Sequence, residues 1–282
     1  MNIELNNTGF IPVEEVDIPD AFYKRFKTGV KVIDSLFGNN GFLPGSTFTL
    51  AGGHGSGKST FLLQLCGILA NQGKNVAYIS GEESIVQISF NSKRLGINKV
   101  KVSNLKDVDD ICNQIVKNKF DFVVIDSFPT MSVERKMNSR KKEEYVCQRL
   151  CSTAKKNDIV IGIIQHVTKT GEYKGSTVLP HSVDITIKMQ KNEDDPDNIN
   201  SRDFIATKNR FGSTSFISLN LKENGFDFYE STKPEKKDPL HNVKQISIQD
   251  ATKLFGTYYN ATKELQKLGF SKESRGMFVK SN

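Results

Sequence analysis

The run from Gly52 to Ser59, which reads GGHGSGKS, constrains the fold of this chain more than any other segment. An apolar run at residues 47–51 precedes it, and an apolar helix candidate at residues 60–70 follows it. Glycines allow successive backbone N–H groups to turn inward around phosphate groups, and the start of the following helix adds positive potential. A strand, a loop of this kind and a helix, in that order, predict a phosphate-binding loop.

The polar residues of this loop indicate what it binds. Lys58 supplies a mobile positive charge for a triphosphate, and the Ser59 hydroxyl is a ligand for Mg²⁺. We therefore predict ATP and Mg²⁺ as cofactors. The residues expected to contact the nucleotide are Gly52, Gly53, His54, Gly55, Ser56, Gly57, Lys58, Ser59 and Thr60.

Composition narrows the class of protein further. The 282 residues can form one core of about 200–230 residues and a small appendage. The formal net charge of +7 favours an anionic partner, with nucleic acid as the first candidate. The four cysteines form no Cys-x-x-Cys pair, so we expect neither a zinc site nor a disulfide framework. No segment approaches the roughly 20 apolar residues of a membrane span, so we expect a cytoplasmic protein that binds no membrane.

Short apolar runs alternate with longer amphipathic stretches, which is typical of a mostly parallel sheet covered by helices. The expected strands lie at residues 47–51, 75–80, 99–102, 120–126 and 158–165, and the expected helices at residues 59–72, 83–95, 105–117 and 141–156. Further strands with tight polar connections are expected at residues 184–190, 203–208, 215–221 and 226–229. We predict an α/β fold whose mostly parallel central sheet is extended by a β-meander.

These patterns divide the chain into an extended segment at residues 1–21, a core at 22–230, a linker at 231–240 and a small basic domain at 241–282. Residues 233–282 hold ten Lys or Arg and five Asp or Glu, an excess of five positive charges. Ile248, Ala251 and Phe255 mark one helix, Gly256 marks a turn, and residues 259–268 form a second helix. This helical appendage fits a winged helix-turn-helix that binds DNA, and it also fits a helical hairpin docked on the core or on a neighbouring subunit.

Two strand ends carry carboxylates that suit the nucleotide site. Asp126 ends an apolar strand, at the position from which a side chain reaches the water shell of Mg²⁺. Glu82 follows the strand at residues 75–80, and we expect it to polarise the attacking water. An acidic residue in the first turn of a helix also complements the helix dipole, so helix capping is the alternative role of Glu82 and Glu83.

Three further residues at strand ends are candidates for contact with a terminal phosphate. Gln165 ends the strand at residues 158–165, whereas the adjacent His166 is expected to be structural. Lys208 and Arg210 project from one side of a later strand end, and no nearby carboxylate pattern explains them. They would neutralise the γ-phosphate bound by an adjoining protomer, an effect of about 10³ to 10⁵ in rate. The alternative is two surface cations that are screened by salt.

Seven segments, in order along the chain, resemble the ATPase core of the bacterial RadA (Sms) family, a branch of the RecA-like recombination ATPases. They are residues 28–38 (TGVKVIDSLFG), 43–46 (LPGS), the phosphate loop, 78–84 (YISGEES), 124–127 (VIDS), 166–169 (HVTK) and 208–214 (KNRFGST). The resemblance covers about residues 22–230, and its KNRFG element is specific to this family.

The resemblance implies a RecA-like P-loop NTPase fold and a hexameric motor that hydrolyses ATP at subunit interfaces and translocates on DNA. The residues that match the site within one subunit are Lys58, Ser59, Asp126 and Glu82. Gln165 matches the RecA glutamine at the γ-phosphate, and Lys208 and Arg210 match groups contributed by the neighbouring subunit. The chain departs from the family pattern in three ways: we expect it to lack the zinc module and the Lon-like domain, and Gln165 stands where the family usually has glycine.

Two loops of RecA-like assemblies face the central axis, and the matching segments here are residues 131–143 and 167–178. Their basic residues are Arg135, Lys136, Arg140, Lys141 and Lys142 in the first segment and Lys169 and Lys174 in the second. Lys and Arg near a nucleic-acid backbone release counterions and bind without sequence preference. The alternative for the first segment is an exposed helix start with ion pairs.

Together these features predict an ATPase that acts as a homo-oligomer on single-stranded or branched DNA, as a helicase, branch-migration or recombination motor in a bacterial or phage-infected cell. The basic tail would add duplex affinity or contact a replication or recombination protein. One alternative is a replicative helicase core resembling the C-terminal domain of DnaB. Another is a KaiC-like regulatory ATPase, which switches protein partners without moving on nucleic acid.

Overall fold

The computed structural model describes residues 11–23, 25–38, 41–167, 178–192, 198–228, 244–255, 261–262, 265–266, 269–274 and 276–280. The chain forms two compact units, Met1–Ser231 and Thr232–Asn282. Within the described residues, no helix is both long enough and apolar enough to cross a bilayer.

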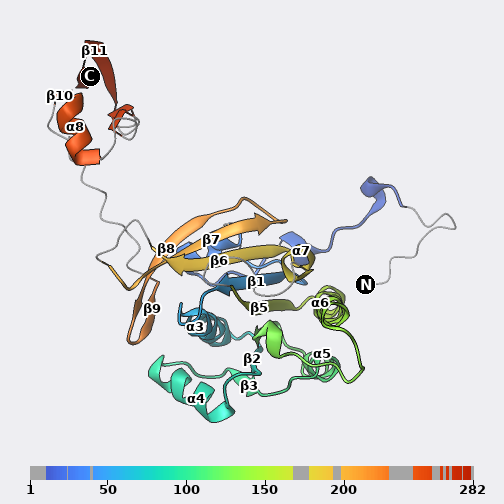
Figure 1. The fold of residues 1–282 in the computed structure, drawn as a ribbon. Coiled ribbons are helices and arrows are strands. Elements are labelled where there is room, and N and C mark those ends of the chain that lie inside the picture. The colour runs from blue at the N-terminus through green and yellow to red at the C-terminus, as the bar shows by residue number, and fades with distance from the viewer. Residues whose placement is uncertain are drawn as a thin grey trace. The chain divides into compact units, whose positions relative to one another are not determined.

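A central sheet organises the first unit (Figure 1). Among the described residues it contains nine strands in the order β3-β2-β4-β5-β1-β6-β7-β8-β9. The parallel strands are β1 (Thr47–Gly52), β2 (Val76–Ser80), β3 (Lys101–Ser103), β4 (Phe122–Asp126), β5 (Val160–His166) and β6 (Ile185–Lys191). An antiparallel meander follows, formed by β7 (Ser201–Asn209), β8 (Phe216–Lys222) and β9 (Gly225–Asp227). The predicted parallel sheet with a β-meander is confirmed.

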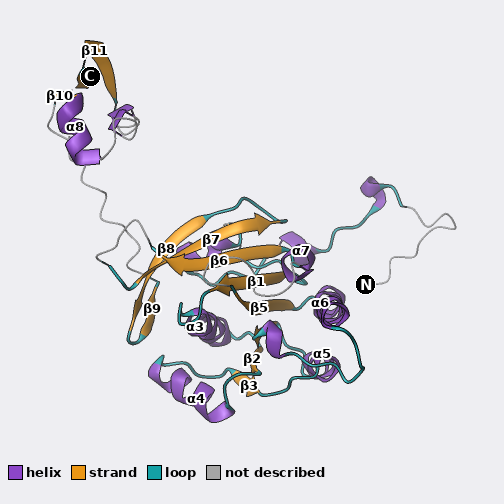
Figure 2. Ribbon diagram, in the orientation of Figure 1, coloured by secondary structure: helices purple, strands orange, loops and turns teal. Residues whose placement is uncertain are grey.

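Helices cover both faces of this sheet (Figure 2). The helix α3 (Lys58–Asn71) covers one face, and α5 (Val108–Lys117) and α6 (Ser139–Asn157) cover the other. The remaining elements are η1 (Val13–Glu15), α1 (Asp20–Tyr23), α2 (Lys31–Leu36), α4 (Ile85–Arg94), η2 (Phe128–Thr130) and α7 (Val178–Ser182). Because both faces are covered, β1, β2 and β4 are buried along their whole length, which explains their mainly apolar sequences.

Successive side chains of each strand point to opposite faces of the sheet. In β5, Val160 and Ile164 belong to the core that contains α3, whereas Ile161 and Ile163 belong to the core that contains α5 and α6. In β4, Val124 likewise belongs to the α3 core. This alternation decides which residues at the strand ends meet the phosphate loop, because that loop leads directly into α3.

Side-chain caps mark the starts of α4, α5 and α6. Ser84 and Gln87 form a capping box ahead of α4, in which each side chain bonds to the backbone of the other residue. Asp107 caps α5, and Asn138 caps α6 by accepting from the Lys141 backbone N–H at 2.8 Å. The predicted starts at residues 83, 105 and 141 therefore differ by two or three residues from the observed starts. Apolar periodicity marks the buried face of a helix, but the cap marks its end.

The second unit has a small core of its own. In its described part, β10 (Gln245–Ser247), β11 (Phe270–Ser274) and β12 (Met277–Lys280) form an antiparallel sheet in the order β10-β12-β11. The helix α8 (Ile248–Phe255) follows β10 directly and contains the three residues that marked the first expected helix of the tail. The turn predicted at Gly256 lies outside the described residues. The winged helix-turn-helix interpretation stays a prediction.

Gly162 provides a test of the packing between β5 and β1. A Cβ atom at this position would lie 2.3 Å from Cζ of Phe48, a ring that is almost fully buried. Because a ring in a close-packed core has little room to move, we expect Gly162→Ala to lower the free energy of unfolding by about 1–3 kcal/mol. Urea denaturation measures this change.

Gly53→Ala is the matched control for that variant, since a Cβ atom on Gly53 would meet nothing within 4 Å. Its free energy of unfolding should stay within about 0.5 kcal/mol of the unmodified protein. Equal losses in the two variants would contradict the packing argument.

Candidate nucleotide-binding site

The phosphate loop joins β1 to α3 and depends on glycine for its shape. Gly55 and Gly57 have φ angles of 68° and 103°, in the left-handed region that favours glycine. A Cβ atom on Gly53 or Gly55 would meet nothing within 4 Å, so open space adjoins the loop there. A Cβ atom on Gly57 would lie 3.0 Å from Leu221 and Phe226, so β8 and β9 press against the start of α3. The loop therefore has the open, backbone-lined form that phosphates require.

Lys58 is the first residue of α3, and its ammonium lies within the loop. Its Nζ donates to the carbonyl oxygens of Gly52 and Gly53, at 2.9 and 2.7 Å. Burial lowers the pKa of Lys58, while the charges of Asp126 and Glu82 act in the opposite direction. The carbonyl oxygens of Gly52 and Gly53 that accept from Lys58 are neutral. An anion bound in the loop would therefore stabilise the charged form of Lys58.

Asp126 ends β4 on the face of the sheet that carries α3. Its carboxylate is buried and accepts a hydrogen bond of 2.5 Å from the hydroxyl of Tyr78. Burial raises the pKa of Asp126, and hydrogen bonds from Tyr78 and Ser59 partly offset that shift. The peptide bond between Asp126 and Ser127 is cis. A carboxylate beside a hydroxyl at the start of α3 forms an oxygen donor set that suits Mg²⁺.

Glu82 lies just beyond β2, next to the ends of β4 and β5. Its Oε1 accepts hydrogen bonds from the Ser127 hydroxyl and from Nε2 of His166, the latter at 3.1 Å. Burial favours a raised pKa, but these two hydrogen bonds, together with the charges of His166 and His54, outweigh it and hold the pKa of Glu82 below its usual value. The side chain is 42% exposed. An ionised, partly accessible carboxylate is what a water-polarising base requires.

Helix capping does not account for Glu82 or Glu83. The N-cap of α4 is Ser84, which forms the capping box with Gln87. The carboxylate of Glu83 accepts a long hydrogen bond of 3.4 Å from Asn91. Burial, with the charge of Asp126, raises the pKa of Glu83. The two neighbouring glutamates therefore have opposite pKa shifts, and the surroundings of Glu82 are the ones that favour the ionised form.

Gln165 faces away from the nucleotide site, which corrects the predicted contact with the terminal phosphate. Its side chain lies on the α5 and α6 face, in a cavity of about 230 Å³ whose lining includes Phe128, Met131 and Val146. His166, one residue later, lies on the α3 face and contacts Glu82. The physical reason is the two-residue period of a strand, because a shift of one residue exchanges the two faces.

Lys208 and Arg210 lie at the edge of the sheet opposite the phosphate loop. The expectation that no carboxylate explains them is wrong for Arg210, whose Nη1 lies 3.3 Å from Oδ1 of the buried Asp184. The Arg210 side chain remains 48% exposed. The Lys208 ammonium donates to three carbonyl oxygens near the C-terminal end of α7, those of Pro180, His181 and Val183. Arg210 is therefore the more accessible of the two cations.

Basic residues of the first predicted DNA segment surround the start of α6. Arg135, Lys136, Arg140 and Lys141 are exposed, and Lys142 is half-buried. Arg140 forms a 3.1 Å ion pair with Glu144, one helical turn later, so the ion-pair alternative holds for this residue. Lys136 and Lys141 line one groove. The two lysines of the second segment, Lys169 and Lys174, lie outside the described residues.

Sequence reasoning missed four side chains that shape the site: Tyr78, Ser127, His166 and Arg202. Tyr78 and His166 share the α3 face with Asp126, so strand alternation was the signal that could have found them. Arg202 is buried in β7, and its Nε donates to the Ser56 carbonyl oxygen at 3.2 Å. No local pattern predicts a contact between residues 146 positions apart.

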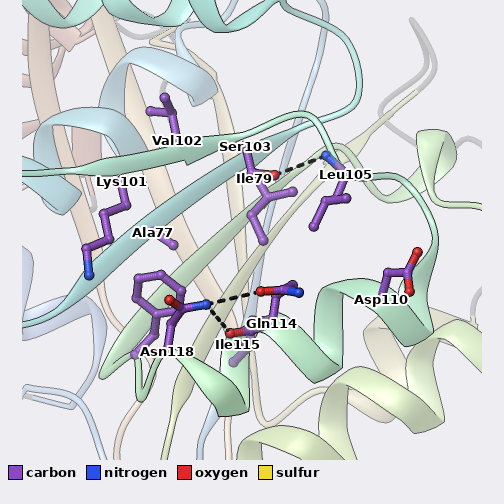
Figure 3. Close-up of a pocket in the computed structure, with 11 residues that line it drawn as sticks. Ala77, Ile79, Lys101, Val102, Ser103, Leu105, Asp110, Gln114, Ile115 and Asn118 are labelled. Carbon is purple, nitrogen blue, oxygen red and sulfur yellow. Dashed lines mark hydrogen bonds between the residues drawn. The ribbon is translucent and has the colours of Figure 1, made fainter.

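A separate hollow of about 610 Å³ opens at the edge strand β3 (Figure 3). Ala77, Ile79 and Ile115 contribute apolar surface, and Lys101 and Asp110 lie at its two sides. None of its lining residues belongs to the phosphate loop, and neither Glu82 nor Asp126 is among them. This hollow is therefore distinct from the nucleotide site.

Known proteins are similar to the core in sequence, and others are similar to it in fold. The family model described as "ATPase: KaiC" matches residues 26–109. The DNA repair protein RadA of Streptococcus pyogenes serotype M6 is 35% identical over 219 residues, which are 76% of this chain and 47% of that protein. The DNA repair protein RadA of Mycobacterium tuberculosis is 31% identical over 228 residues, 78% of this chain and 46% of that protein. The chain spans about half the length of these curated relatives.

Solved structures with low sequence identity have the same fold. A DnaB-like replicative helicase aligns with a TM-score of 0.64 at 14% identity, over 71% of this chain and 61% of that chain. A KaiC-like protein from Pyrococcus horikoshii OT3 aligns with a TM-score of 0.58 at 20% identity, over 72% of this chain and 97% of that chain. The fold and the phosphate loop define the class of a RecA-like P-loop ATPase. Within that class, the chain carries an ATPase core similar to that of the RadA (Sms) proteins.

The orientation of Gln165 leads to a prediction about turnover. We expect Gln165→Met to keep the rate of ATP hydrolysis within about threefold of the unmodified protein, because an adaptable apolar side chain of similar length fills the same space. In the described structure the Oε1 atom of Gln165 has no hydrogen-bond partner to lose. Steady-state hydrolysis assays measure this, and a loss beyond about tenfold in a stably folded variant would assign a phosphate-sensing role to Gln165 after all.

Proposed function

We propose that this protein is an ATP-hydrolysing, DNA-binding motor that acts as a homo-oligomer in DNA repair or recombination, as a helicase or branch-migration ATPase. One observation supports this proposal most. The phosphate loop, Glu82 and Asp126 lie at one edge of the sheet, and the exposed Arg210 lies at the other. Two copies in contact could therefore complete a site that one copy holds only in part.

Within one copy, the phosphate loop and Lys58 would hold the phosphates of ATP, and Ser59 and Asp126 would hold Mg²⁺. The bound Mg²⁺ would supply charge neutralisation at the phosphate oxygens. Glu82 is suited to orient the attacking water and to accept its proton, because it is ionised and partly exposed. Tyr78 orients the Asp126 carboxylate through its 2.5 Å hydrogen bond.

The strand register argues that Arg210 acts on a neighbouring copy. Asn209, which precedes it, pairs with Ile185 of β6, and Ile185 pairs with Phe48 near the start of β1. Gly52, at the phosphate end of β1, lies four positions after Phe48, a length of about 13 Å at the usual rise of a strand. That length exceeds the reach of an arginine side chain. Arg210 would thus serve the γ-phosphate of an adjoining subunit, with Lys208 holding the adjacent backbone.

The Arg210 assignment can be tested by complementation. We expect Arg210→Ala to retain nucleotide binding and to lose turnover by about 10³-fold, the usual effect of a cation supplied in trans. Mixing this variant with Glu82→Gln should restore part of the activity, because some interfaces then combine an intact Glu82 with an intact Arg210. Arg94→Ala, which removes an exposed guanidinium from α4, is the control. Full activity in isolated monomers would contradict the proposal.

Exposed cations at the start of α6 support the DNA part of the proposal. Lys136 and Lys141 line one groove, and no ion pair is formed by either within the part of the chain that the structure describes. Three of the proteins compared point the same way, because the two RadA relatives are DNA repair proteins and the DnaB-like protein of the same fold is a replicative helicase. The basic second unit is a further candidate surface for DNA or for a protein partner.

Salt dependence tests the DNA contact. We expect single-stranded DNA to accelerate ATP hydrolysis, and the double variant Lys136→Ala/Lys141→Ala to bind that DNA more weakly. The slope of log affinity against log salt should fall in magnitude by about 1.4, since each lysine on a single strand contributes about 0.7. Lys155→Ala/Lys156→Ala, at the other end of α6, is the matched control.

A KaiC-like regulatory ATPase is the second candidate function, favoured by the family model over residues 26–109. The same measurements separate the two. Turnover that does not respond to single-stranded DNA, even at low salt, would favour the regulatory function.

A further inference from the structure

Two histidine rings are stacked beside the Glu82 carboxylate. The ring centroids of His54 and His166 lie 4.5 Å apart, and the ring planes differ by 16°. His54 belongs to the phosphate loop, and His166 is the last residue of β5. The stack therefore connects the phosphate loop to the end of β5, where His166 contacts the Glu82 carboxylate.

The hydrogen bond between His166 and Glu82 has a defined direction. Glu82 is ionised, and an ionised carboxylate can only accept, so Nε2 of His166 carries the proton and donates it over 3.1 Å. Only 12% of the His166 side chain is exposed, and its Nδ1 is buried without a partner in the described structure. The contact with Glu82 and the stack on His54 are therefore what orients this ring.

The two oxygens of Glu82 have different surroundings. Both hydrogen bonds, from Ser127 and from His166, end on Oε1. Oε2 accepts no hydrogen bond from the described residues. One oxygen is therefore anchored, and the other is available to a water molecule.

We propose that His166, braced by the ring of His54, is a positioning residue that holds the Glu82 carboxylate for its action on the attacking water. The proposal rests on the ATPase function proposed above. A partly exposed glutamate would otherwise sample several rotamers. Because the bracing ring of His54 belongs to the phosphate loop, the position of the Glu82 carboxylate depends on the conformation of that loop.

Neighbouring charges do not replace this contact. Lys58 of α3, Asp126 of β4 and Glu83 of the same turn act on Glu82 through space. In the described structure none of them forms a hydrogen bond or an ion pair with Glu82. The two direct contacts of its carboxylate are Ser127 and His166.

Steady-state kinetics of three variants test the positioning role. We expect His166→Ala to lower kcat by at least about tenfold while KM for ATP changes by less than about threefold, because the contact acts on the base and not on nucleotide binding. His166→Gln should recover most of kcat, since its amide nitrogen can donate to the same oxygen. His54→Ala should give a smaller loss than His166→Ala, because it removes the brace and leaves the hydrogen bond.

A double-variant cycle distinguishes positioning from a general structural effect. In a Glu82→Gln background, His166→Ala should cause no further loss of single-turnover hydrolysis, because it acts through Glu82. Unchanged kcat in His166→Ala, failure of His166→Gln to restore it, or an independent loss in the Glu82→Gln background would each overturn this inference while leaving the ATPase function standing. Absence of hydrolysis by the unmodified oligomer with DNA would instead overturn the ATPase function and this inference with it.

Discussion

The register of the parallel strands is the constraint on which the nucleotide site depends. Ser80 pairs with Asp126, and Gly52 pairs with His166, so the ends of β2, β4, β1 and β5 meet at one edge of the sheet. Alternation then selects the residues that face α3. Tyr78, Asp126 and His166 are on that face, and the phosphate loop opens onto it. The site is a consequence of strand pairing and not of proximity in the sequence.

The antiparallel meander has the complementary consequence. The strand β7 runs against β6, so its last residues lie near the start of β1, far from the phosphate loop. A parallel strand in the same place would have ended beside the loop. Reversal of direction thus places Arg210 out of reach of the phosphate loop of its own copy. Asp184, which also accepts from the Thr47 backbone N–H at 2.9 Å, ties this cation to the start of β1.

Two ionisable groups of the site, Lys58 and Asp126, are buried in surroundings that disfavour their charged forms. Burial lowers the pKa of Lys58 and raises that of Asp126, so the charged form of each is disfavoured. Phosphates and Mg²⁺ would supply the opposite charges that these two groups lack. Glu82 differs, because hydrogen bonds from Ser127 and His166 keep it ionised. Such a site is less stable than an apolar core would be, which is the usual cost of function.

Local patterns in the sequence determined the phosphate loop, the order of strands and helices, and the carboxylates Glu82 and Asp126, because spacing within one element is enough to reveal them. Only the tertiary structure decided that His166 and not Gln165 lies against the phosphate loop, and that Asp184 pairs with Arg210. Which of His166 and Gln165 lies on the α3 face depends on the position of each residue in the strand, to within one residue. Apolar periodicity in the sequence does not fix that position. The pairing of Asp184 with Arg210 depends on contacts between segments distant in the chain, which no local pattern records.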